Sequence, residues 1–177
     1  MSVRWKLYWL LVAATLAVYF TMLLWSLRRI ASAAGGLAPF DLRPGGYGFE
    51  DARAFLGALD ADTVAFYLNV QHRLDLVYPA MLAAVLGVAV FRLLPGPRAL
   101  KLAAVAVPVV GAACDYLENA AVAELLRAGA GDLTREAVSV AGRWTVLKSS
   151  ATSLSMLLLA GLLVYHALRY WRGRGTG

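Results

Sequence analysis

The polar residues that could do chemistry lie inside an apolar run of the chain. Residues 102–126 are rich in alanine and valine and long enough to cross a bilayer, yet they contain Asp115, Glu118 and Asn119. These three residues share one face of a helix because they are three or four positions apart. A charge at the centre of a membrane helix costs about 3 kcal/mol or more. We therefore expect this face to meet protein, water or a ligand instead of lipid.

Two further apolar segments carry polar side chains at helical spacing. They hold Gln71, Asp75 and Tyr78 in one segment and Lys148, Thr152 and Ser155 in the other. In a bundle whose polar faces turn inward, these residues meet those of the central segment, and Thr15 and Tyr19 reach in from a fourth side. The candidate ligand-binding residues are Asp75, Asp115, Glu118, Asn119, Lys148, Gln71, Tyr78 and Thr152.

Three carboxylates of this set face a single amine. One lysine, Lys148, cannot neutralise all three acids (Asp75, Asp115 and Glu118), so at least one of them is expected to have a raised pKa. Such an acid can exchange a proton or bind a cationic or hydroxyl-bearing ligand. Any catalysis would be proton transfer or hydrolysis with a carboxylate as general acid or base, and no residue is assigned a catalytic role. The alternative is a structural ion pair between Lys148 and Asp115 or Glu118 that orders the bundle.

The composition is that of an integral membrane protein. Hydrophobic residues make up 60% of the chain and charged residues 16%, and the mean hydropathy is +0.64. The net charge of +6 comes from basic residues beside apolar runs, which is typical of membrane flanks and argues against nucleic-acid binding. The single cysteine, Cys114, excludes an internal disulfide. His72 with Asp75 is a weak metal signal, and His72 and His166 are expected near opposite membrane faces, so neither a metal nor a cofactor is predicted.

Four membrane spans and one longer polar interval divide the chain. The spans are expected at about residues 7–27, 74–94, 102–126 and 144–170, with an extramembrane segment at about 30–62. A short amphipathic helix at about 50–59, with Ala54, Phe55, Leu56 and Leu59 at helical spacing, lies on the membrane or caps the bundle. We therefore predict an all-α integral membrane four-helix bundle, a single domain over residues 1–177, with this helix and loop region on the outer side.

Start signals and prolines refine these boundaries. Asp60 or Asp62 is expected to cap a helix that continues from about residue 63 to residue 94. Pro79 lies inside this helix and removes the amide that would bond the carbonyl of Asp75, so a kink there leaves an acid and a free carbonyl in one place. Thr134 is predicted to cap a separate short helix that ends near Val140, before the last span.

The distribution of charge indicates an orientation. With the amino terminus inside, the short cytoplasmic segments are densely basic, and all eleven acids lie on the outer side or within the membrane. We therefore predict a multi-pass protein whose two termini are both cytoplasmic.

The motif Gln71-x-x-Leu74-Asp75-x-x-Tyr78-Pro79, followed by Asp115-x-x-Glu118-Asn119 and Lys148, resembles a group of small bacterial four-span membrane proteins without assigned function. This resemblance covers about residues 38–165 and implies a bacterial inner-membrane location but no activity. The stretch Asp75-Leu76-Val77-Tyr78-Pro79 is also similar to the EXPERA group of sterol isomerases and sigma-2-type lipid-binding proteins. The acid that the EXPERA group carries at the end of its first span is missing from this sequence.

Three functions are compatible with these features. The first is a polar cavity within the membrane that binds a lipid-like or small amphipathic ligand, with or without turnover by a carboxylate. The second is an accessory or assembly subunit of a larger membrane complex with a purely structural ion-pair core. The third is an oligomeric transporter or channel, for which no inverted repeat is visible. The expected partners are membrane lipids, such a ligand, and further copies or other membrane subunits.

Overall fold

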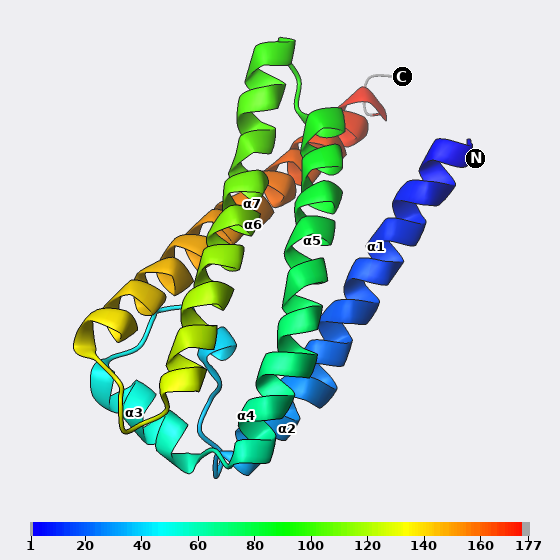
Figure 1. Ribbon diagram of the computed structural model, residues 1–177. Coiled ribbons are helices and arrows are strands. Elements are labelled where there is room, and N and C mark those ends of the chain that lie inside the picture. Colours follow the sequence, from blue (N-terminus) through cyan, green and yellow to red (C-terminus); the bar gives the residue numbers. More distant parts are fainter. Residues whose placement is uncertain (1, 175–177) are drawn as a thin grey trace.

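The computed structural model describes residues 2–174, and between these residues the chain forms only helices, turns and irregular connections. Four long helical segments, Val3–Ala33, Ala61–Leu93, Arg98–Ala128 and Arg135–Arg174, are long and apolar enough to cross a membrane. They run roughly along one another in a bundle (Figure 1). The predicted all-α class and the four apolar helices are thus confirmed, and each helical segment is longer than the span predicted for it.

Each of the first two long segments contains one π-helical turn. The segments divide into α1 (Val3–Thr21), η1 (Met22–Ser26) and α2 (Leu27–Ala33), and into α4 (Ala61–Phe66), η3 (Tyr67–Gln71) and α5 (His72–Leu93). A π turn adds a residue to the helical turn and is frequent at functional sites. The two turns contact each other and bury Met22, Ser26, Tyr67 and Gln71. No pattern in the sequence predicted these π turns.

The last segment is one continuous helix. Helix α7 (Arg135–Arg174) runs for 40 residues, so the prediction of a separate short helix ending near Val140 is wrong. The helix passes through Ala141 and Gly142 without a break. Gly142 packs directly on the backbone of Tyr47 there. The predicted cap is confirmed, since the amide of Ala137 donates to Oγ1 of Thr134 at 3.1 Å.

Helix α5 lies at the centre of the bundle and contacts α1, α7 and α6 (Arg98–Ala128), while α7 packs chiefly along α6. The start of α1 and the end of α7 lie at one end of the molecule, and α3 (Phe49–Ala58) crosses the other end (Figure 1). The even number of long helices explains why both termini reach the same end.

Helix α3 covers the end of the bundle with its apolar face. Ala52, Phe55 and Leu56 are buried, whereas Ala54 is exposed, so the predicted apolar face was wrong at one position. Phe55 packs edge-on against Phe40 with ring centroids 4.9 Å apart. These contacts anchor the connection between α2 and α3, which includes the short helix η2 (Phe40–Leu42).

Helix α4 begins where a capping aspartate was expected. The amide of Thr63 donates to Oδ1 of Asp60 at 2.7 Å, which confirms Asp60 as the cap. This hydrogen bond lowers the pKa of the Asp60 carboxyl. The helix therefore starts at Ala61 and runs on through η3 into α5, as one element.

Candidate functional site

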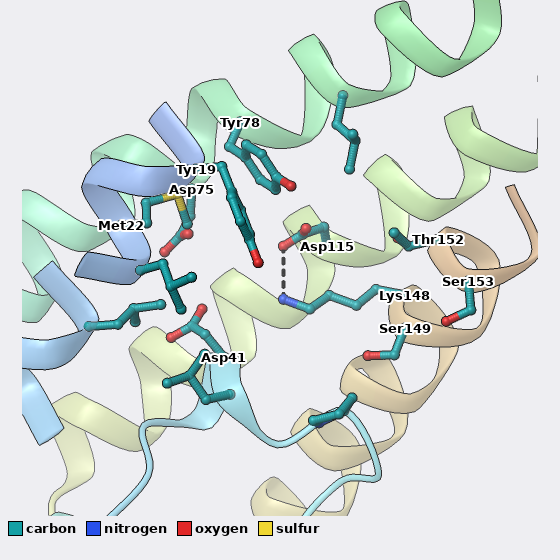
Figure 2. A pocket seen from close by; sticks show the side chains of 15 residues that line it. Tyr19, Met22, Asp41, Asp75, Tyr78, Asp115, Lys148, Ser149, Thr152 and Ser153 are labelled. Atoms are coloured by element: carbon teal, nitrogen blue, oxygen red, sulfur yellow. Dashed lines mark hydrogen bonds and ion pairs between the residues drawn. The ribbon is translucent and has the colours of Figure 1, made fainter. Parts of the chain in front are cut away.

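A cavity of about 360 Å³ lies between the four long helices and the connection after α2 (Figure 2). Its wall combines acidic, hydroxyl and apolar side chains: Tyr19, Met22, Leu23, Leu27, Asp41, Leu42, Pro44, Asp75, Tyr78, Leu82, Asp115, Lys148, Ser149, Thr152 and Ser153. Five of the eight predicted site residues line it, namely Asp75, Tyr78, Asp115, Lys148 and Thr152. The structure places Gln71, Glu118 and Asn119 behind this wall, where they contact the lining residues.

Lys148 of α7 is engaged by two acids of α6. Its Nζ lies 3.2 Å from Oδ1 of Asp115 and forms a second ion pair with Oε2 of Glu118. The other oxygen of Glu118, a residue only 1% exposed, accepts a hydrogen bond from Oγ1 of Thr145 at 2.6 Å. The sequence left open which acid pairs with Lys148. In the structure it is both Asp115 and Glu118, and the charge of the amine is thereby already compensated.

Asp75 of α5 takes no part in this ion pair. Its Oδ1 accepts a hydrogen bond from Nε2 of Gln71 at 2.9 Å, and its Oδ2 is buried without a hydrogen-bond partner among the described residues. The residue is only 4% exposed and lies in the cavity wall. A buried polar atom without a partner costs free energy, so this oxygen is a favourable place for a donor from a ligand.

The backbone next to Asp75 is also polar, for the reason expected from Pro79. Residue 79 has no amide hydrogen for the carbonyl of Asp75. This carbonyl instead meets Nδ2 of Asn119 at 3.4 Å, and the same nitrogen lies 3.4 Å from Oδ1 of Asp115. The backbone carbonyl of Asn119 is in turn 2.9 Å from Nε2 of His72. Asn119 thus connects the free carbonyl of α5 to the ion pair of α6 and α7.

Two tyrosines form the wall between α1 and α5. The rings of Tyr19 and Tyr78 stack with centroids 5.8 Å apart, and both lie beside Asp115 in Figure 2. The prediction that Tyr19 reaches inward is therefore matched by its position. Thr15, which was expected beside Tyr19, is buried but does not line the cavity. Its hydroxyl donates to the carbonyl of Leu11 in its own helix at 2.7 Å.

The sequence did not indicate Asp41 as a site residue. This aspartate belongs to η2 and faces the cavity across from Lys148 (Figure 2), while its Oδ2 accepts a hydrogen bond from the hydroxyl of the buried Tyr67. It lies in an irregular, glycine-rich interval where no periodicity points to an inward face. Thr145 was also missed, although it is three residues before Lys148 on the same face of one helix.

Behind this wall lies Tyr47, an aromatic residue outside the four long helices. Its ring packs on Phe40 with centroids 4.6 Å apart, and its hydroxyl is buried without a hydrogen-bond partner in the part of the chain that the structure describes. Burial raises the pKa of the Tyr47 hydroxyl well above its ordinary value, so the group stays neutral at physiological pH.

The histidines bond backbone carbonyls. Nε2 of His72 approaches the carbonyl of Asn119 and Nε2 of His166 that of Leu93, at 2.9 and 2.8 Å. Over residues 2–174 no three histidine, cysteine, aspartate or glutamate side chains are arranged so that they could hold a metal ion.

Fold and site together define an all-helical chain with four helices of membrane-spanning length and a cavity with acidic and apolar walls between them. Comparison of the chain with protein-family models, with curated proteins and with solved structures found no match in any of the three. The two resemblances drawn from the sequence stay predictions.

Proposed function

We propose that this chain is a multi-pass protein of the bacterial inner membrane, with both termini in the cytoplasm and α3 on the outer side. Four helices of sufficient length and apolar character support the spanning arrangement. The two termini lie at the same end of the bundle, and the short segments at that end are densely basic, as expected for the cytoplasmic side (Figure 1). The bacterial origin rests on the resemblance of the Gln71 to Pro79 motif.

The proposed function is binding of a lipid-like or small amphipathic ligand in the cavity between the four helices. The observation that carries it is Oδ2 of Asp75, a buried carboxylate oxygen that has no hydrogen-bond partner among residues 2–174 and lies in the wall of a cavity of about 360 Å³. Sites for small molecules commonly measure roughly 300–1,000 Å³ and combine an apolar lining with a few polar groups. Met22, Leu23 and Leu82 provide the apolar part of this lining.

The polar end of the ligand is expected to be a hydrogen-bond donor. The cavity presents acceptors from Asp41 and Asp75, whereas the amine of Lys148 is already held by two acids. A hydroxyl or amine would satisfy the free oxygen of Asp75 without adding a buried negative charge. If the ligand is turned over, Asp75 is the carboxyl placed to exchange a proton with it, and the reaction would be proton transfer or hydrolysis.

Native mass spectrometry of the detergent-purified protein tests this function. We expect wild type to retain a defined small amphipathic adduct and Asp75→Asn to lose it while keeping its melting temperature. Asp62→Asn is the matched control, because Asp62 is an exposed aspartate at the start of the helical segment that carries Asp75. The proposal would be refuted if Asp75→Asn retains the adduct, or if wild type carries no adduct at all.

A second candidate is an accessory subunit whose ion pair is purely structural. The observation in its favour is the pairing around Lys148, whose amine contacts both Asp115 and Glu118, while Thr145 donates to the other oxygen of Glu118. It predicts that the protein purifies together with another membrane subunit and holds no small ligand. An oligomeric transporter or channel has no observation of this kind behind it.

A further inference from the structure

A second cavity, of about 400 Å³, lies at the opposite end of the bundle from α3. It is lined by Ser2, Arg4, Trp5 and Tyr8 of the first segment and by Val88 and Arg92 of α5. Helix α1 leans away from α5 towards its own start, which leaves a fork between the two helices (Figure 1). The hydroxyl of Tyr8 donates to the carbonyl of Val85 at 3.4 Å and so marks where the helices come together.

The charges in this fork have no acidic counterpart. Arg4 and Arg92 are both exposed, and neither forms an ion pair with an acid among residues 2–174. The acids of the chain all lie between Asp41 and Glu136 in the sequence. Trp5 stands edge-on to Tyr8 with centroids 5.8 Å apart, and such amphipathic rings are typical of the membrane–water interface. Two guanidinium groups beside two interfacial rings form a site for an anion at headgroup level.

The fork continues into an apolar groove between α5 and α6. This groove measures about 610 Å³ and is lined by Ala80, Ala83, Ala84, Gly87, Val88, Phe91, Arg92, Val105 and Val109. Val88 and Arg92 belong to both cavities, so the charged fork and the groove meet there. At the charged end, Nζ of Lys101 lies 5.6 Å from the ring centroid of Phe91. An anion site therefore adjoins a groove lined mostly by alanine, glycine and valine.

We propose that this composite site binds one anionic phospholipid, on the premise that the four helices span a bilayer. The phosphate lies between Arg4 and Arg92, where each guanidinium can donate two parallel hydrogen bonds. One acyl chain follows the groove past Ala84 and Gly87, where the absence of larger side chains leaves room. A soluble phosphate would not fill the groove, and a zwitterionic lipid would leave the positive charge of the fork uncompensated.

The test is lipid titration of the detergent-purified protein, read by native mass spectrometry with phosphatidylglycerol and phosphatidylcholine as probes. We expect wild type to prefer phosphatidylglycerol. Each basic residue near an anionic lipid is worth about fivefold in affinity, so Arg4→Gln/Arg92→Gln should bind phosphatidylglycerol about 25-fold more weakly. Arg172→Gln/Arg174→Gln removes the same charge at the same end of the bundle and should change this affinity far less.

The acyl-chain part of the site is tested separately. Ala84→Leu narrows the groove without changing charge and should weaken binding of both lipids, whereas Ala160→Leu, at an exposed position of α7, should not. Equal losses of phosphatidylglycerol affinity in the two double-arginine variants would overturn the proposal, because the lipid would then be attracted by basic charge anywhere at this end of the bundle. Competition by millimolar inorganic phosphate, or unchanged binding in Ala84→Leu, would also overturn it, since the occupant would then not be a lipid chain in the groove.

Discussion

At the scale of single residues, Lys148 allows two acidic side chains to lie between the helices, because its amine pairs with both. Its amine compensates Asp115 and Glu118, which lie on one turn of α6. Removing one partner from a buried pair leaves an uncompensated charge and typically costs about 3–5 kcal/mol, more than the pair itself contributes. Lys148 therefore stabilises the protein mainly because its loss would leave the charges of Asp115 and Glu118 uncompensated.

We predict that Lys148→Met lowers the free energy of unfolding by about 3–5 kcal/mol, because the buried Glu118 and the half-buried Asp115 lose the amine that pairs with both. Adding Glu118→Gln in the same chain should recover part of the loss, since one of these charges is then gone. Denaturant titration in detergent measures both values, with Lys6→Met, at an exposed position, as control. A Lys148→Met protein as stable as this control would show that the pair is not buried as described.

Asn119 has a separate role, which is to satisfy the carbonyl that Pro79 leaves without an amide. We predict that Asn119→Leu costs roughly 1–3 kcal/mol, the penalty for a buried carbonyl without a donor. In a Pro79→Ala background the restored amide of residue 79 can bond the carbonyl of Asp75, so the same substitution should cost less. Thermal unfolding of the four proteins in this cycle gives the coupling. Equal costs in both backgrounds would contradict this role.

The polar groups on regular helices were predictable, because three- and four-residue spacing fixes which side chains share a face. This is why Asp75, Asp115 and Lys148 were expected to converge and do line one cavity. Asp41 was not predictable, since its position depends on how Phe40 packs under α3. The pairing of Lys148 depends on the rotation of α6 against α7, which no single-helix pattern specifies.

At the scale of elements, close approach of α6 and α7 is what brings the charged residues within reach. Gly111 allows this approach: a Cβ atom there would lie 3.4 Å from Cβ of Ala151 and 3.6 Å from Oγ1 of Thr152. Glycine at such positions lets two helix backbones pack tightly. The geometry of the ion pair therefore depends on a residue that carries no functional group.

We predict that Gly111→Leu destabilises the protein by about 1–3 kcal/mol, because the larger side chain overpacks the contact between α6 and α7. Gly161→Leu is the matched control, since a Cβ atom at Gly161 meets nothing within 4 Å. This control should be neutral or slightly stabilising because leucine favours the helix over glycine. Melting temperatures in detergent compare the two. Equal shifts would mean that Gly111 does not lie in a packed contact.

Helix starts were easier to predict than helix continuity. Asp60 and Thr134 cap helices as expected, because a side-chain acceptor before an apolar run has few other roles. Continuity depends on tertiary contacts instead. The chain passes through Gly142 without a break because this residue packs on Tyr47, and the π turns at Met22–Ser26 and Tyr67–Gln71 pack against each other. Neither contact produces a local pattern in the sequence from which it could be predicted.

At the scale of the whole molecule, the proposed orientation places the end with α3 outside and the turn between α5 and α6 inside. Single cysteines can test this in a Cys114→Ala background, at two exposed positions near opposite ends, Asp132 and Ala99. We predict that a membrane-impermeant maleimide labels Asp132→Cys in intact cells and Ala99→Cys only after lysis. The reverse order would invert the topology, and equal labelling would contradict a spanning bundle.

The most direct test of the ligand cavity is to capture what occupies it. A diazirine amino acid in place of Leu82 lies in the cavity wall, and the same group in place of Leu163 lies on an exposed part of α7. After illumination in membranes, we expect one defined amphipathic species crosslinked at position 82, with a much lower yield when Asp75→Asn is also present. Position 163 should capture a mixture of bulk lipids regardless of Asp75. The same mixture at both positions, unaffected by Asp75→Asn, would contradict the binding of a defined ligand in this cavity.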